Sequence, residues 1–361
     1  MKKITFLRNE FIYFFSILNL IPKKQIGKTY LSLNKCSKIY YYNKYIKIEC
    51  KLNNSIKENI NINFKYESLS KIIKTIYKKD ITFIFIKKKI YFNNENFRLL
   101  ILTKKIKKKI KIKENKNKTI LLKNNDMLKV LKSITFVFKI EQNIFNGIYF
   151  NIKKKKIKII SCDNFRFSIN EIDFFSKEKI KSKEFYIKET YVKLIKKILI
   201  KDKKTYVYIK NKSLIFYINK ETKIEIKTYN NNEFDYNSIY KIKSENKLAE
   251  IEQSSLLNAL KRAKILCKNK NKYVNLIIKK NSVIITSNNL EQEVFIEKIY
   301  SYIFYSKKKK ICFNIEYLID FVNIFNNEKI MLFYNKKKNI AIFKISNNIN
   351  YKYMLMPIEY F

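Results

Sequence analysis

Residues 147–161, GIYFNIKKKKIKIIS, hold the pattern that decides the fold. Two runs rich in Ile, Tyr and Phe flank a turn made of lysines. β-branched and aromatic residues favour strands, and a short polar break between two such runs is typical of a hairpin. Because the chain has only two glycines, we expect asparagine to take left-handed turn positions. The stretch therefore predicts an antiparallel hairpin.

The same pattern recurs along the chain, and segments with helical spacing lie between its copies. The other strand-rich stretches are DITFIFIKKKIYFNNENFRLLIL, YVYIKNKSLIFYINKETKIEIKTY, VNLIIKKNSVIITS and IMLFYNKKKNIAIFKI. Helical segments begin near residues 8, 124 and 254, and a second set begins near 68, 188 and 314. Each set recurs at roughly 115 to 130 residues, which predicts one αβ unit repeated three times. We expect domains at 1–115, 116–245 and 246–361, although no proline- or glycine-rich linker marks the joins.

The charge of the chain favours a polyanionic partner. Lys and Arg number 78 against 30 acidic residues in 361, a formal net charge of +48. Such a charge is typical of nucleic-acid binding. Drift toward AT-rich codons explains the enrichment in Lys, Asn, Ile, Tyr and Phe equally well, so the charge permits this partner without requiring it.

The residues that catalysis or metal binding would need are missing. The chain has no histidine, and its five cysteines are scattered without a CxxC pair, so we expect no metal site and reduced thiols. Two glycines cannot build a phosphate loop. The N-terminal stretch is superficially like a signal peptide, but Arg8 and Glu10 interrupt it and favour a core helix. The sequence therefore predicts a binding protein rather than an enzyme, with no cofactor.

Three segments together resemble the bacterial DNA polymerase III beta subunit, the replicative sliding clamp. In residues 145–169, FNGIYFNIKKKKIKIISCDNFRFSI is similar to the family's Leu-Asn-Gly strand, turn and Asp-Gly-His-Arg-Leu loop. Residues 256–297 are similar to the family's third-domain helix and hairpin, and SNNLEQE stands where the family has Asn-Asn-Pro-Glu-Gln-Glu. The final helix CFNIEYLIDFVNIF and the tail YMLMPIEYF resemble the family's C-terminus. The order and spacing of these segments match over residues 116–361.

The resemblance implies an α+β fold of three repeated DNA-clamp domains, two protomers of which close head to tail into a ring. Helices would line a central hole and antiparallel sheets would lie outside. Duplex DNA would pass through the hole without its sequence being read. On this reading, lysine-rich helix faces point at the DNA. The expected DNA-facing residues are Lys23, Lys24, Lys28, Lys71, Lys74, Lys78, Lys129, Lys132, Lys193, Lys196, Lys197, Lys261, Arg262 and Lys264.

The resemblance also implies two protein contacts. One is a dimer interface in which Phe97 and Leu99 face Ile265 and Leu266. The other is a cleft that docks short peptides from the DNA polymerase III alpha subunit and the clamp loader. The expected cleft residues are Phe145, Cys162, Phe165, Arg166, Phe167, Phe234, Ile239, Met354, Leu355, Met356, Pro357 and Ile358.

Several cleft positions depart from the family pattern. Phe165 stands where the family has histidine, Asn164 where it has glycine, and Ser238 where it has arginine. These changes predict a more aromatic lining and a changed peptide preference. Strand alternation would put Phe165 and Phe167 on one face and Arg166 on the other.

The alternative hypothesis is a monomeric, non-specific nucleic-acid-binding protein whose lysines and aromatic side chains form a sequence-tolerant surface. The mass in solution distinguishes the two, because a clamp must have twice the 43.9 kDa mass of the chain. The apolar run near the N-terminus is far shorter than the ~20 residues of a membrane span. We therefore expect a cytoplasmic, nucleoid-associated bacterial protein with no membrane partner.

Overall fold

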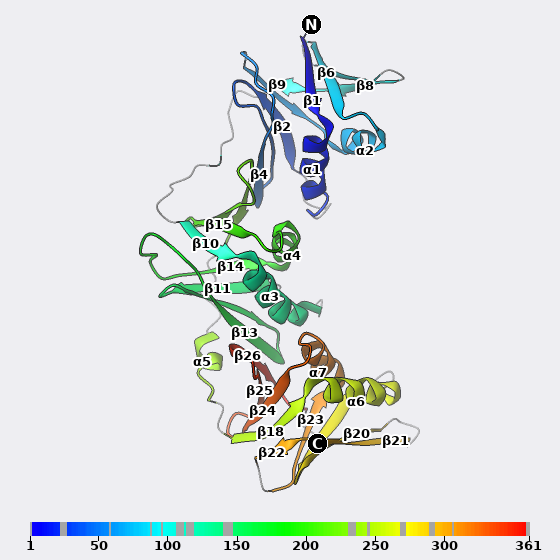
Figure 1. The fold of residues 1–361 in the computed structure, drawn as a ribbon, viewed down its shortest axis with the longest axis vertical. Helices are drawn as coiled ribbons and strands as arrows, with labels where there is room; N and C mark the ends of the chain where they lie inside the picture. Colours follow the sequence, from blue (N-terminus) through cyan, green and yellow to red (C-terminus); the bar gives the residue numbers. More distant parts are fainter. Residues whose placement is uncertain are drawn as a thin grey trace. The chain divides into compact units, whose positions relative to one another are not determined.

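A computed structural model gives the fold (Figure 1). It describes every residue except 1, 22–26, 58, 87–88, 95–96, 106–111, 113–118, 140–146, 230–235, 244–245, 268–271, 289–292, 305–306 and 359–361. The chain divides into two compact units, which are described separately. Unit 1 comprises Met1–Asn125, Phe174–Lys181 and Thr190–Tyr229; unit 2 comprises Asp126–Asp173, Ser182–Glu189 and Asn230–Phe361.

Unit 1 contains two antiparallel sheets. The smaller has the strand order β1-β6-β7-β8, and the larger has the order β10-β15-β16-β17-β4-β3-β2-β5-β9. Helices α1 (Arg8–Leu18) and α2 (Glu67–Thr75) contact each other, and α4 spans Glu189–Ile198. The strands are β1 (Lys2–Leu7), β2 (Lys28–Leu33), β3 (Lys38–Tyr42), β4 (Ile46–Lys51), β5 (Ile60–Phe64), β6 (Asp80–Ile86), β7 (Lys89–Asn94), β8 (Phe97–Leu102), β9 (Lys104–Lys105), β10 (Thr119–Lys123), β15 (Lys204–Ile209), β16 (Ser213–Tyr217) and β17 (Thr222–Lys227).

Unit 2 repeats this plan. Its larger sheet has the order β14-β11-β12-β13-β26-β25-β24-β18-β22, and its smaller sheet has the order β21-β20-β19-β23. The helices are α3 (Asn124–Thr135), the 3-10 helix η2 (Phe136–Lys139), α5 (Tyr236–Tyr240), α6 (Gln253–Leu266) and α7 (Ile315–Val322). The strands are β11 (Gly147–Lys153), β12 (Lys156–Cys162), β13 (Arg166–Asp173), β14 (Lys183–Lys188), β18 (Asn246–Glu252), β19 (Tyr273–Lys279), β20 (Ser282–Asn288), β21 (Val294–Tyr300), β22 (Tyr302–Ile303), β23 (Lys309–Asn314), β24 (Lys329–Asn335), β25 (Ile340–Ile345) and β26 (Asn348–Leu355).

The core of unit 2 lies between its helices and its sheets. Helices α6 and α7 contact each other, and α6 contacts β18, β20 and β21 (Figure 1). On α6, Leu256, Ala259, Leu260 and Ala263 are all buried. The apolar face of this helix therefore contacts the sheets, as amphipathic helices require.

The predicted secondary structure is confirmed. Each of the six segments with helical spacing forms a helix, and each of the five strand-rich stretches forms paired antiparallel strands. The N-terminal segment, expected to form a core helix, forms β1 and α1, with Phe11, Phe14 and Phe15 fully buried. In the part of the chain that the structure describes, no helix is long and apolar enough to cross a membrane.

The strand orders explain why the chain forms two compact units although the sequence pattern repeats three times. β17 from the middle of the chain pairs with β4, which extends the large sheet of unit 1. β13 pairs with β26, which extends the large sheet of unit 2. Pairing along two continuous sheets thus divides the middle residues between the units. The expected division at 1–115, 116–245 and 246–361 remains a prediction.

Asparagine takes three of the six described left-handed positions, as expected, but lysines take both positions in the turn of the 147–161 hairpin. The described non-glycine residues with positive φ are Lys154, Lys155, Asp202, Asn281, Asn327 and Asn339. Gly147 serves a different purpose, because a Cβ atom there would lie 2.2 Å from the backbone oxygen of Ile187 on β14. It permits the close approach of β11 and β14.

Candidate functional site

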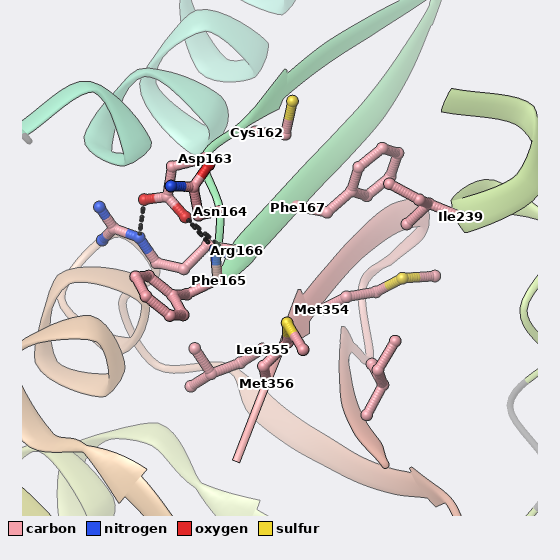
Figure 2. A pocket seen from close by; sticks show the side chains of 11 residues that line it. Cys162, Asp163, Asn164, Phe165, Arg166, Phe167, Ile239, Met354, Leu355 and Met356 are labelled. Carbon is pink, nitrogen blue, oxygen red and sulfur yellow. Dashed lines mark hydrogen bonds and ion pairs between the residues drawn. The ribbon is translucent and has the colours of Figure 1, made fainter. Parts of the chain in front are cut away.

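One cleft in unit 2 brings together most of the residues expected to bind partner peptides. It has a volume of about 210 Å³ and is mainly apolar. Its walls come from the β12–β13 loop, from α5 and β25, and from the end of β26 (Figure 2). The lining residues are Cys162, Asp163, Asn164, Phe165, Arg166, Phe167, Ile239, Ile340, Met354, Leu355 and Met356.

Asp163 shapes the loop between β12 and β13. Its Oδ1 atom accepts the backbone N–H groups of Phe165 at 2.9 Å and Arg166 at 2.7 Å. Its own N–H donates to the Arg166 carbonyl oxygen at 2.9 Å, and Cys162 pairs with Phe167 across the two strands. Aspartate forms such local turns readily because its short carboxylate reaches backbone donors two and three residues ahead. The result is a tight loop with Asn164 and Phe165 at its tip.

The guanidinium group of Arg166 is fully engaged inside the protein. Its Nε donates to Asp163 Oδ2 at 2.7 Å, and its Nη1 lies 3.4 Å from Asp320 Oδ2. Nη2 donates to the Val137 carbonyl oxygen at 3.2 Å, and the guanidinium carbon lies 4.1 Å from the Tyr317 ring centroid. Figure 2 shows this group directed at Asp163, away from Phe167 and the methionines. Arg166 therefore fixes the loop and offers no free charge to a ligand.

Helix α7 supplies two of these contacts. The side chain of Asn314 accepts the backbone N–H groups of Glu316 and Tyr317, and so caps the helix at its N-terminus. Tyr317 and Asp320 are one turn apart, on the side of the helix that meets Arg166. The cap and the arginine together hold the loop against α7.

The cleft has a buried floor and an exposed rim. Phe167 and Met354 are cross-strand neighbours with exposed fractions of 3% and 2%. Phe165 and Met356 are 52% and 47% exposed, and the Met356 N–H donates to the Phe165 carbonyl oxygen at 3.0 Å. The hydrogen bond joins the chain's tail to the loop. Phe165 and Met356 thus offer apolar surface on both sides of the cleft.

Burial makes Cys162 a small apolar lining group. Burial, with a smaller contribution from the neighbouring Asp163, raises the pKa of its thiol to about 12. The thiol is therefore protonated at neutral pH. Among the described residues, no three Cys, Asp or Glu side chains lie close enough to hold a metal ion.

The predicted alternation of Phe165, Arg166 and Phe167 is wrong for Phe165. Strand β13 begins at Arg166, so Phe165 lies in the loop and not in the strand. Its ring lies 6.3 Å from that of Tyr317 on α7, while Phe167 belongs to the core. The Asp163 turn produces this difference, because it bends the backbone before the strand pattern starts.

The remaining predicted cleft residues have different placements. Ile239 lines the cleft from α5, whereas Phe145 and Phe234 lie outside the described residues. Pro357 and Ile358 follow the lining residues, and the Ile358 N–H donates to the Cys312 carbonyl oxygen at 2.9 Å. Asp163, Asn164 and Ile340 also line the cleft, although only Asn164 was noted in the sequence as a cleft position, for its departure from the family pattern. The DNF turn was a signal for the first two, but only strand pairing brings Ile340 there.

The lysines expected to face DNA are largely exposed. Seven of them lie on three helices: Lys71 and Lys74 on α2, Lys129 and Lys132 on α3, and Lys193, Lys196 and Lys197 on α4. Six of these seven side chains are exposed, and Lys196 is partly buried. Lys28 instead begins β2, Lys78 follows the end of α2, and Lys23 and Lys24 lie outside the described residues.

On α6, Lys261, Arg262 and Lys264 are exposed, but two of them have acidic partners. Arg262 donates to both oxygens of Glu297 at 2.8 and 2.5 Å, and Lys264 lies 3.7 Å from Glu316.

Of the four residues expected at a dimer interface, two lie on strand β8 and two lie at the end of helix α6. Leu99 lies on β8, the edge strand of the small sheet of unit 1, and is partly exposed; the side chain of Phe97 lies outside the described residues. Ile265, near the end of α6, is 65% exposed, and Leu266 is partly exposed. The α6 helix contacts β21, the edge strand of the small sheet of unit 2.

Comparison with known proteins finds matches in sequence and in fold. Residues 243–359 match the family described as DNA polymerase III beta subunit, C-terminal domain. The beta sliding clamp of Buchnera aphidicola subsp. Rhopalosiphum padi is 29% identical over 224 residues. That alignment covers 59% of this chain and 57% of the Buchnera protein, so it spans less than two thirds of the curated relative.

Solved structures match the chain almost completely. The DNA polymerase III subunit beta of Pseudomonas aeruginosa has a TM-score of 0.87 at 14% identity, covering 99% of this chain and 100% of that one. A putative beta subunit from Eubacterium rectale gives 0.87 at 19% identity, and the Thermotoga maritima protein gives 0.82 at 14%, both with coverage of 99% and 100%.

The fold defines the class of protein first, because the whole chain has the α+β fold of polymerase clamps. In sequence, residues 243–359 match the C-terminal domain of the bacterial DNA polymerase III beta subunit, and the chain is similar to the beta sliding clamp of Buchnera aphidicola.

Proposed function

We propose that this protein is a DNA sliding clamp, which encircles duplex DNA and keeps the replicative polymerase on its template. The observation that carries the proposal is the match to solved beta subunits over 99% of the chain at a TM-score of 0.87. The function is topological and requires no catalysis. It would operate on the bacterial chromosome in the cytoplasm, and three features of the chain support it.

Two exposed sheet edges support a head-to-tail dimer. β8 carries Leu100 and Leu102, which are 46% and 72% exposed, and β21 carries Val294 and Ile296, which are 62% and 68% exposed. An edge strand with unpaired backbone groups and apolar side chains is usually covered in the native assembly. Pairing of β8 in one protomer with β21 in its partner would cover both edges. Two such contacts would close a ring.

The exposed lysines of the helices suit a duplex whose sequence is not read. Lys71 and Lys74 project from α2 opposite the buried Leu69 and Ile73. Lysine ammonium groups attract phosphates without selecting bases, so such faces allow a ring to slide. We assign the same role to the exposed lysines of α3, α4 and α6.

The cleft supports docking of partner proteins. Its buried floor and half-exposed rim suit a short segment with a few large apolar anchors, and methionine adapts to anchors of different shape. We assign this cleft to the polymerase III alpha subunit and to the clamp loader. Both would bind it in turn.

Retention on circular DNA tests the proposal. We expect protein loaded onto nicked circles to stay bound at moderate salt and to leave when the DNA is linearised, because a ring slides off free ends. The mass in solution should be twice the 43.9 kDa of the chain. Equal retention on linear and circular DNA, with steep weakening by salt and a monomeric mass, would instead favour a non-specific nucleic-acid-binding protein.

A further inference from the structure

The two segments that supply Ile239 and Ile340 to the cleft both continue into exposed lysines. Lys241 and Lys243 follow α5, and Lys336, Lys337 and Lys338 form the turn between β24 and β25. We propose that these five lysines, the basic rim, select partner segments in which acidic side chains flank the apolar anchors. This inference rests on the proposed docking function of the cleft.

Specific hydrogen bonds hold the two lysine segments together. The Asn335 side chain donates to the Lys243 carbonyl oxygen at 3.3 Å and accepts the Lys338 N–H at 3.0 Å. The Tyr334 hydroxyl group donates to Asn339 Oδ1 at 2.6 Å. The rim is therefore a built part of the surface, joined to the cleft through Ile340 at the start of β25.

The α5 side of the rim is fixed as well. The Lys352 ammonium group donates to the carbonyl oxygens of Tyr240 at 3.2 Å and Ile242 at 2.5 Å. Ile239, Tyr240 and Ile242 pack against the buried cluster that contains Phe167 and Met354. The position of the exposed lysines relative to the cleft is thus set by the same contacts that place Ile239.

The cleft itself cannot supply the charge that would select such a partner. Arg166, the one cation among the described lining residues, is bound by Asp163 and Asp320. The side chains of Lys336, Lys337 and Lys338 have no ion pair or hydrogen-bond partner in the part of the chain that the structure describes. Positive charge available to a ligand therefore lies on the rim while the cleft provides apolar surface. The complementary ligand is an acidic peptide with apolar anchors.

The chain offers a matched control for this charge. Lys153, Lys154 and Lys155 are also exposed; Lys153 ends β11, and Lys154 and Lys155 form the turn that joins it to β12 in the same unit. Strand β12 runs from Lys156 to Cys162, so its seven residues separate that turn from the cleft by about 20 Å. Replacing either triplet by glutamine removes three positive charges, but only one triplet borders the cleft.

The test uses fluorescein-labelled synthetic peptides with a Leu-Ala-Leu-Phe centre. One acidic peptide carries three aspartates before the centre, and the other carries three aspartates after it. Each has a neutral counterpart in which asparagines replace the aspartates. We expect at least one acidic peptide to bind about fivefold or more tightly than its neutral counterpart at about 50 mM salt, and the gain to shrink at about 300 mM. The K336Q/K337Q/K338Q variant should lose this gain, and the K153Q/K154Q/K155Q variant should keep it.

The possible outcomes separate this inference from the function it rests on. If both triple variants lose the gain in affinity for the acidic peptide equally, the attraction is a diffuse one to a basic protein. That result would overturn the role of the basic rim. The absence of any gain from aspartate would overturn it as well. If the neutral peptides also fail to bind, the docking function of the cleft is wrong, and this inference falls with it.

Discussion

The exposed rim of the cleft provides a test of docking that spares the fold. Phe165→Ala with Met356→Ala removes one apolar side chain from each side of the cleft. Fully burying a Phe or Met side chain contributes about 1.5–3 kcal/mol. Because roughly half of each remains exposed, covering both with a peptide should contribute about 1.5–3 kcal/mol in total. The dissociation constant should therefore rise about tenfold to a hundredfold.

The choice of residues matters because the floor of the cleft belongs to the core. Phe167 is 3% exposed, and its replacement by alanine should cost about 3–5 kcal/mol of stability. A loss of binding in Phe167→Ala would thus be confounded with unfolding. Phe165 and Met356 already face solvent, so their removal should change the free energy of unfolding by less than about 1 kcal/mol.

Fluorescence anisotropy with the neutral Leu-Ala-Leu-Phe peptide measures the effect, and a thermal melt checks the fold. Tyr302→Ala with Phe304→Ala is the control, because these side chains are 68% and 56% exposed in the same unit and do not line the cleft. We expect the control to bind as the unmodified protein does. Unchanged peptide affinity in the Phe165 and Met356 variant, with the melting temperature preserved, would refute the docking role of these two side chains.

Three further predictions concern assembly and stability. Ile265→Ala with Leu266→Ala should yield monomers at micromolar concentration, because each buried side chain contributes roughly 1.5–3 kcal/mol; an unchanged dimer in sedimentation would exclude these residues from the interface. Gly147→Ala should cost about 3 kcal/mol or more in urea denaturation, because the new Cβ would lie 2.2 Å from the backbone oxygen of Ile187. Burial, aided by the nearby Lys344, lowers the pKa of Lys352 to about 8. Since an unfolded lysine has a pKa of about 10.4, the unfolded chain binds more protons between these values, and stability should rise with pH there relative to Lys352→Met; parallel pH profiles would contradict this.

The sequence by itself determined the local structure, because helix and strand periodicities are local properties of the chain. The lysine turn in 147–161 and its repeats identified hairpins, and apolar stripes identified the helix faces that are buried. The resemblance then placed residues of the loop around Cys162 to Phe167 and the tail from Met354 to Ile358 on one site, and the structure brings the loop together with the tail as far as Met356.

Only the tertiary structure decided which cleft residues are available to a ligand. Periodicity gave Phe165 and Phe167 the same face, but the Asp163 turn exposes the first ring and strand pairing buries the second. The sequence suggested Arg166 as a cleft residue. In the structure its guanidinium group donates a hydrogen bond to Asp320, which lies 154 residues away in the sequence. Ile340 reaches the cleft because β25 pairs with β26, and Asn335 brings two lysine segments together. Such contacts join residues far apart in sequence, and no local pattern encodes which distant partner will complete a buried charge or cover a side chain.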